Sequence, residues 1–164
     1  MAQTQIRIGG FGGQGVILSG IIVGRAAAIY GGLHATLIQS FGPEARGSSS
    51  SAELIVADEP ILYPYVKDLD MLVVLSQDAY TRFTPSLKKG GLLVTESDLV
   101  SLTSPAPEAT HFVVPATRLA EEIGRKIVLN IITVGFFGAV SRLMPAEALE
   151  AAVRESVPPP TAPS

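Results

Sequence analysis

The sequence of 164 residues contains no cysteine and no tryptophan, and only 16% of its residues are charged. The absence of cysteine excludes disulfide bonds and iron–sulfur clusters held by thiolates of this chain. Its two histidines, His34 and His111, lie far apart and lack the spacing of metal ligands, so no metal site is predicted. A formal net charge of −3 argues against a nucleic-acid partner.

Targeting and membrane-spanning segments are also lacking. The N-terminus has no basic segment followed by an apolar run, so no secretory signal is predicted. The longest apolar stretches, residues 16–30 and 127–140, are too short or too interrupted to cross a bilayer. We therefore expect a cytoplasmic protein without a membrane partner.

The composition is apolar for a single domain of this size. Hydrophobic residues make up 47% of the chain, and the mean hydropathy is +0.38. A parallel sheet buried on both faces explains such a composition. A surface covered by partner subunits explains it equally well. The sequence leaves both explanations open.

Strand and helix patterns alternate along the chain, which indicates an α/β fold. We predict a single three-layer α/β/α domain over residues 1–156, with a mostly parallel Rossmann-like sheet. The remaining residues, 157–164, are rich in proline and are expected to be extended or disordered. Strands are predicted at residues 4–9, 35–39, 51–57, 71–75, 92–95 and 112–114. Helices are predicted at residues 16–30, 77–89, 117–124, 127–140 and 146–155.

The predicted helix at 127–140 is apolar nearly all round, which is typical of a buried helix. Gly135 and Gly138 lie within it and would allow another helix to approach closely. Asn130 is its polar exception and needs hydrogen-bond partners if buried. It is either a satisfied core amide or a residue of an interface.

Glycine is concentrated in residues 9–15, between the first predicted strand and the first predicted helix. Gly10, Gly12 and Gly15 match the G-x-G-x-x-G spacing of dinucleotide-binding turns. Glycine lets backbone N–H groups approach a ligand, and a helix N-terminus attracts phosphate. The segment is therefore either a phosphate-binding loop or a tight turn that binds nothing.

The accessory residues of the common nucleotide sites are missing. An NAD site needs an acidic residue at the end of the second strand, but the first acidic residue of the chain is Glu44. A Walker A motif needs lysine where Val16 stands, and the first lysine is Lys67. The glycine segment thus fits neither class.

A second polar segment, residues 40–51, follows the second predicted strand and contains Arg46 and several serines. In a doubly wound sheet it would emerge at the same edge as the glycine segment. Arg46 has five donors that suit a phosphate or carboxylate. The alternative is that Glu44 pairs with Arg46 and the segment is structural.

Two motifs together resemble a known family. Gly-x-Gly-Gly-Gln-Gly at residues 10–15, followed by Ser-Phe-Gly-Pro-Glu-x-Arg-Gly at 40–47, is similar to the gamma subunit of 2-oxoacid:ferredoxin oxidoreductases. The resemblance extends over about residues 4–156. One departure is Ser48, where members of the family often have glycine after Arg-Gly.

The resemblance implies a subunit of an enzyme that converts a 2-oxoacid and coenzyme A to an acyl-CoA, CO2 and a reduced acceptor. It implies thiamine-binding and 2-oxoacid-binding subunits and a ferredoxin-like iron–sulfur subunit as partners. Thiamine diphosphate, magnesium and iron–sulfur clusters are expected on those partners, because this chain has no Gly-Asp-Gly motif and no cysteine. No catalytic residue is predicted here. By the resemblance, the residues expected to contact coenzyme A are Gly12, Gly13, Gln14, Gly15, Arg46 and Gly47.

Two other functions stay open on the sequence. One is a stand-alone Rossmann-like nucleotide-binding or regulatory protein, against which the missing acid and lysine count. The other is an assembly subunit whose glycine segment no longer binds a ligand.

Overall fold

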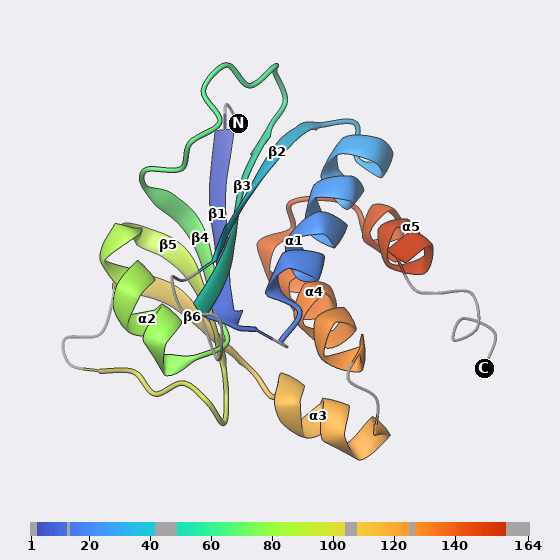
Figure 1. Cartoon of the computed structure of the whole chain (residues 1–164). Coiled ribbons are helices and arrows are strands. Elements are labelled where there is room, and N and C mark those ends of the chain that lie inside the picture. The colour runs from blue at the N-terminus through green and yellow to red at the C-terminus, as the bar shows by residue number, and fades with distance from the viewer. Residues whose placement is uncertain (1–2, 13, 42–48, 104–107, 125–126, 157–164) are drawn as a thin grey trace.

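The computed structural model describes residues 3–12, 14–41, 49–103, 108–124 and 127–156 (Figure 1). Among them, no helix combines the length and the apolar character that crossing a bilayer requires. The strands are β1 (Gln3–Phe11), β2 (His34–Phe41), β3 (Ser49–Ala57), β4 (Leu69–Val74), β5 (Leu87–Glu96) and β6 (Ala109–Val114). The helices are α1 (Val16–Arg25), the π-helical turn η1 (Ala26–Tyr30), α2 (Gln77–Phe83), the 3-10 turn η2 (Thr84–Ser86), α3 (Ala116–Ile123), α4 (Ile127–Ser141) and α5 (Ala146–Ser156).

The six strands form one sheet in the order β2-β3-β1-β4-β5-β6. β1, β4, β5 and β6 are parallel, whereas β3 runs antiparallel to both of its neighbours, β1 and β2. β2 is therefore parallel to β1 but separated from it by β3. The predicted mostly parallel sheet is confirmed, and the carboxyl ends of β1 and β2 lie at the same edge.

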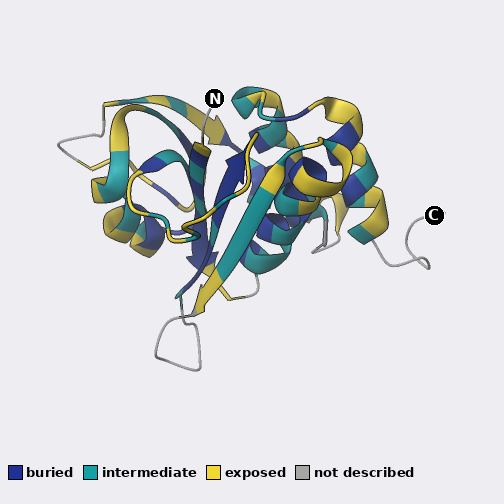
Figure 2. Ribbon diagram, turned by 90° about the horizontal axis from the view of Figure 1, so that it is seen from above, coloured by how far each residue is buried: buried dark blue, intermediate teal, exposed yellow. Residues whose placement is uncertain are grey.

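Helices cover both faces of the sheet, so the predicted three-layer α/β/α fold is confirmed (Figure 1). On one face, Ile6, Ile8 and Val73 pack into a core with residues of α1, α4 and α5. On the other face, Leu72 packs with Tyr80 of α2. Figure 2 shows the central strands almost entirely buried, with helices whose outer sides are exposed. The alternation of Leu72 and Val73 between the two cores follows the period of two in a strand.

The helix predicted at 77–89 is wrong beyond Phe83. Ser76 caps its N-terminus by accepting from Ala79 N, but the helix ends at Phe83 and the 3-10 turn follows. Pro85 has no N–H to continue the hydrogen bonding of the helix. The chain from Leu87 onward instead pairs with β4 as strand β5.

Helix α4 was predicted to be buried all round, but only one of its sides is covered by the described residues. Gly138 does allow a close approach, because an added Cβ would collide with Leu149 of α5. Gly135 faces open space, where an added Cβ has no neighbour within 4 Å. It lines a groove of about 590 Å³ between α4 and α5. The second face of α4 is thus not covered by the described part of the chain.

Candidate functional site

The glycine turn lies at the carboxyl edge of the sheet, between the end of β1 at Phe11 and the start of α1 at Val16. Gly15 is the N-cap residue, with a left-handed φ of 73° that favours glycine. No described side chain caps α1, and its first turn contains no acidic residue. The first N–H groups of an α-helix have no partner within the helix. These donors, with the positive end of the helix dipole, are what a phosphate requires.

Gln14 shapes this turn through both ends of its side-chain amide. Its Oε1 accepts from Phe11 N at 2.7 Å, and its Nε2 donates to the carbonyl of Leu75 at 2.8 Å. The amide therefore ties the turn to both β1 and the end of β4. Gly10 leaves room for this, since an added Cβ there would lie 2.5 Å from Gln14 Oε1. Contact between Gln14 and a ligand stays a prediction.

Asn130 of α4 completes the wall of the turn. A Cβ built on Gly15 would collide with the Asn130 side chain, so the amide lies directly against the N-cap. Asn130 is only 7% exposed, and within the described residues its side chain has no hydrogen-bond partner. Buried polar groups are normally hydrogen-bonded. The sequence singled out Asn130 but left its role open, and the structure places it at the glycine turn.

Only part of the sequence-predicted site can be located. Gly12 and Gln14 lie in the turn and Gly15 at its end, as the spacing predicted. Gly13, Arg46 and Gly47 lie outside the described residues, so their contact with a ligand stays a prediction. The two ends of the second polar segment are nevertheless described.

Those two ends lie beside the glycine turn. Ser40, at the end of β2, pairs with Ser51 of β3. On the other side of β3, Ser50 pairs with Gly10 and Ser49 pairs with Phe11. The prediction that both segments reach the same edge is therefore confirmed for the residues that flank 42–48.

A polar cluster on the α2 face of this edge was not predicted from the sequence. Arg82 of α2 donates from Nη1 to Ser49 Oγ at 2.5 Å. Arg7 of β1 forms an ion pair of 2.5 Å with Glu53 of β3. Both guanidinium groups stack on the ring of Phe83, at 4.6 Å for Arg7 and 5.4 Å for Arg82. The sequence did indicate a helix after β4, and such a helix starts near this edge of the sheet. Which side of that helix faces the edge, and therefore where Arg82 lies, depends on how α2 packs.

Comparison with known proteins shows the family to which the chain belongs. Residues 5–162 match the model of the pyruvate ferredoxin/flavodoxin oxidoreductase family. The chain therefore belongs to this family.

Similar proteins also show which type of subunit this chain is. The chain is 45% identical to 2-oxoglutarate synthase subunit KorC of Methanocaldococcus jannaschii, over 95% of this chain and 84% of that protein. It superimposes on the gamma subunit of a keto/oxoacid ferredoxin oxidoreductase from Geobacter sulfurreducens with a TM-score of 0.85 and 34% identity, covering 99% of this chain and 90% of that one. The chain is thus a gamma-type subunit of a 2-oxoacid:ferredoxin oxidoreductase, and the resemblance noted in the sequence is confirmed.

A third likeness concerns the fold alone. The 2-oxoglutarate:ferredoxin oxidoreductase from Magnetococcus marinus, solved with 2-oxoglutarate, coenzyme A and succinyl-CoA bound, matches with a TM-score of 0.79 and 21% identity. The match covers 94% of this chain but 27% of that chain. The same fold therefore also occurs as one part of a larger polypeptide.

Proposed function

We propose that this chain supplies a coenzyme A-binding wall to a cytoplasmic, thiamine diphosphate-dependent 2-oxoacid oxidoreductase. The observation that carries the proposal is the uncapped N-terminus of α1 with the buried, unpartnered amide of Asn130 against it. A phosphate of the coenzyme would accept from the N–H groups of the turn and from the Asn130 amide. The whole reaction converts a 2-oxoacid anion and coenzyme A to an acyl-CoA and releases CO2, one proton and two electrons, which pass to the acceptor.

The remaining chemistry is assigned to partner subunits. This chain contains no cysteine, so it cannot supply thiolates to an iron–sulfur cluster. It also lacks the Gly-Asp-Gly motif of a thiamine diphosphate site. Subunits that bind thiamine diphosphate with magnesium and the 2-oxoacid, and a ferredoxin-like iron–sulfur subunit, are the partners that complete the enzyme.

We further propose 2-oxoglutarate as the substrate. The support is the 45% identity to a subunit named for 2-oxoglutarate synthase. The measurement is kcat/KM of the assembled enzyme for 2-oxoglutarate, pyruvate and 2-oxoisovalerate. A higher value for either of the other two acids would contradict this choice.

The topology argues against the NAD-binding alternative. In the dinucleotide-binding fold the second strand lies next to the first, and an acidic residue at its end binds the ribose. Here β3 lies between β1 and β2, which moves the end of β2 away from the turn by about 10 Å, twice the strand spacing. No acidic residue occurs in β2. Micromolar binding of NAD by calorimetry would restore this alternative.

Asn130→Asp in the assembled complex tests the proposal. The replacement keeps the shape of the side chain, and a negative charge near the N-terminus of α1 is favourable for the helix. The same charge repels a phosphate and replaces a donor by an acceptor. A hydrogen bond to a charged group contributes about 1.5–3 kcal/mol, so we expect KM for coenzyme A to rise by about 10- to 150-fold.

Thr133→Val is the matched control. Thr133 lies on the same helix, is 2% exposed, and donates to Leu129 O of its own helix at 2.8 Å. Its replacement should leave KM for coenzyme A unchanged. Reduction of the clusters by 2-oxoacid in a single turnover without coenzyme A should persist in both variants. An unchanged KM in Asn130→Asp would favour a subunit that acts in assembly only.

A further inference from the structure

A small polar cavity opens on the α2 face of the carboxyl edge, on the opposite side of the sheet from α1. The strand register places its walls. Gly9 faces α2, since an added Cβ would lie 2.7 Å from Phe83 Cε2. Ser51 pairs with Gly9 and Ser40 pairs with Ser51, so the three residues share that face. The cavity has a volume of about 70 Å³ and is also lined by Ser49, Glu53 and Arg82.

The serines of this cavity offer unused donors. Ser51 is only 4% exposed, and in the described part of the chain its hydroxyl has no hydrogen-bond partner. Ser49 Oγ accepts from Arg82, so its own proton remains free to be donated. Ser49 and Ser51 thus bring two hydroxyl groups to the wall of one cavity. Each hydroxyl can donate a hydrogen bond to an anion there.

Arg82 provides the positive charge. Only one of its five N–H groups is used by Ser49. Its other polar contact is with Asp78 at 3.6 Å, and the two side chains are 49% and 46% exposed. Ion pairs this exposed contribute little. The stacking of Arg82 on Phe83 holds the guanidinium group at the mouth of the cavity while most of its donors remain available.

Among the described lining residues, Glu53 is the one acidic side chain, and Arg7 compensates it. The Arg7–Glu53 ion pair is 2.5 Å long, and its side chains are 15% and 17% exposed. A half-buried pair of this kind has no net charge to repel an anion. Within the described lining, Arg82 is therefore the cation that remains for an entering anion.

The size of the cavity restricts the anion. A water molecule takes about 30 Å³ in the liquid, so a cavity of about 70 Å³ suits a small group such as a phosphate. Ser49 and Ser50 pair with Phe11 and Gly10, and paired Cα atoms lie about 4.5–5.5 Å apart. The cavity is thus within reach of a ligand whose other phosphates occupy the glycine turn. Coenzyme A has this form, with a diphosphate and a separate 3′-phosphate monoester.

We propose that Arg82, Ser40, Ser49 and Ser51 form a second anion site that binds the 3′-phosphate of coenzyme A. The inference rests on the proposed function, since it assigns a separate part of the same ligand. It adds a specificity determinant on the α2 face, in addition to the glycine turn on the α1 face. Arg82 and Ser51 contact only the monoester in this arrangement.

The test compares coenzyme A with 3′-dephospho-coenzyme A in the assembled complex. Arg82→Gln should raise KM for coenzyme A by about tenfold or more, the lower range for a charge-assisted contact. KM for 3′-dephospho-coenzyme A should not change, because the group that Arg82 binds is absent. Ser51→Ala should have a smaller effect with the same selectivity, and Arg82→Lys should restore part of the affinity.

Asp78→Asn is the matched control on the same helix. It removes the competing carboxylate of Arg82 and keeps the length of the side chain, so KM for coenzyme A should stay or fall. Thermal unfolding of each complex shows that the variants are folded. Ser51→Ala keeps the proposal testable if Arg82→Gln fails to assemble.

The outcomes separate the two proposals. If Arg82→Gln and Ser51→Ala change KM equally for both coenzymes, or for neither, the 3′-phosphate site is wrong. If Asn130→Asp still raises KM for both coenzymes in that case, the glycine turn binds coenzyme A and only the second site fails. If neither Asn130→Asp nor Arg82→Gln has an effect, the proposed function fails as well.

Discussion

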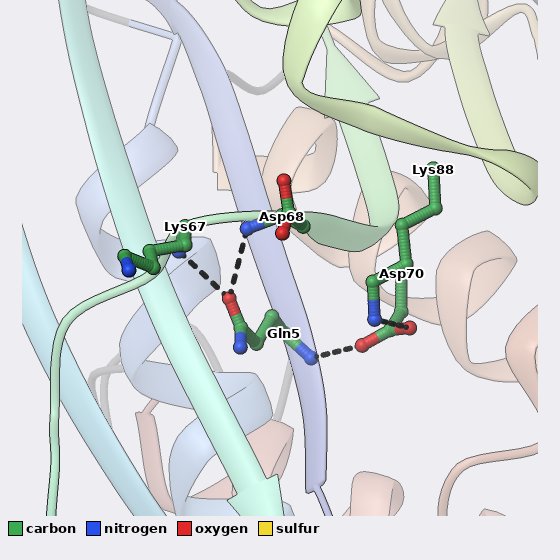
Figure 3. A network of polar contacts seen from close by, with 5 residues as sticks. All are labelled: Gln5, Lys67, Asp68, Asp70 and Lys88. Carbon is green, nitrogen blue, oxygen red and sulfur yellow. Dashed lines mark hydrogen bonds and ion pairs between the residues drawn. The ribbon is translucent and has the colours of Figure 1, made fainter.

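The two ends of the parallel strands differ in how their polar groups are used. At the amino end, Gln5 and Asp70 form a closed network (Figure 3). Gln5 Oε1 accepts from the backbone N–H groups of Lys67 and Asp68, at 2.8 Å and 3.3 Å. Asp70 accepts from Gln5 N at 2.7 Å and from Lys88 Nζ at 2.9 Å. Both carboxylate oxygens of Asp70 therefore have partners within the chain.

At the carboxyl end, buried polar groups lack such partners among the described residues. Asn130 and Ser51 are 7% and 4% exposed and have no hydrogen bond from their side chains. The helix that starts there has no side-chain cap. Ligands of open α/β sheets bind outside the carboxyl ends of the strands. The amino end thus uses its polar groups within the fold, whereas the carboxyl end has polar groups to spare for the ligand that we propose.

The largest effect is expected from Gly15→Ala. A left-handed residue with a side chain is strained by about 1–2 kcal/mol, and the added Cβ would displace Asn130. We expect a lower melting temperature of the complex and loss of saturation by coenzyme A. Gly32→Ala is a suitable control, because Gly32 is also left-handed but has nothing within 4 Å of an added Cβ. If both variants retain normal coenzyme A kinetics, the carboxyl end is not the site.

Arg46→Ala should act on coenzyme A without affecting the 2-oxoacid. Loss of a charge-assisted contact corresponds to about 10- to 150-fold in KM for coenzyme A. KM for the 2-oxoacid should change little, since decarboxylation precedes acyl transfer. Steady-state kinetics of the assembled enzyme measure both constants. Destabilisation of the complex with an unchanged KM for coenzyme A would make the segment structural.

Asp70→Ala, at the amino end of the strands, should lower stability without changing KM for coenzyme A. It leaves Gln5 N without an acceptor and Lys88 without its carboxylate, and we expect a loss of about 1–2 kcal/mol in the free energy of unfolding. KM for coenzyme A should remain that of the parent enzyme. Chemical denaturation and kinetics together check this. A raised KM for coenzyme A in Asp70→Ala would contradict the assignment of ligand binding to the carboxyl end alone.

Two glycines of α4 form a matched pair for stability. Gly138→Leu overpacks the contact with Leu149 and should lower the free energy of unfolding by about 1–3 kcal/mol. Gly135→Leu places its side chain in the open groove and should have a smaller effect on the chain itself. Denaturation of the isolated chain compares them. Equal losses would mean that the groove closes in solution.

The smallest effect concerns pH. Burial lowers the pKa of His111, whose Nε2 lies 2.8 Å from Thr95 Oγ1. The unfolded chain therefore binds this proton more readily than the folded one, and stability is lost as pH falls below the unfolded pKa of about 6.5. His111→Gln should remove part of the decrease in melting temperature between about pH 7 and about pH 5. An identical pH profile in both proteins would contradict this assignment.

Much of the fold could be predicted because it follows from local patterns. The period of two and the continuous apolar runs identified all six strands, although the observed strands are longer than the predicted ones. The extra length of β5 was missed because Lys88 and Lys89 look like the end of a helix. Pairing with β4 decides the structure of that segment, and a pairing between distant residues has no local signal.

The sequence by itself determined the glycine turn, its place between a strand and a helix, and the absence of thiolate ligands. These depend on residue types and spacing along the chain, which local sterics and chemistry translate directly into structure. Only the tertiary structure decided that β3 separates β1 from β2, that Asn130 lies against Gly15, and that Arg82 meets Ser49. Each of these depends on which face of a helix or which edge of a strand packs against a segment far away in the sequence. These contacts depend on how the whole core packs, so no single sequence motif predicts them.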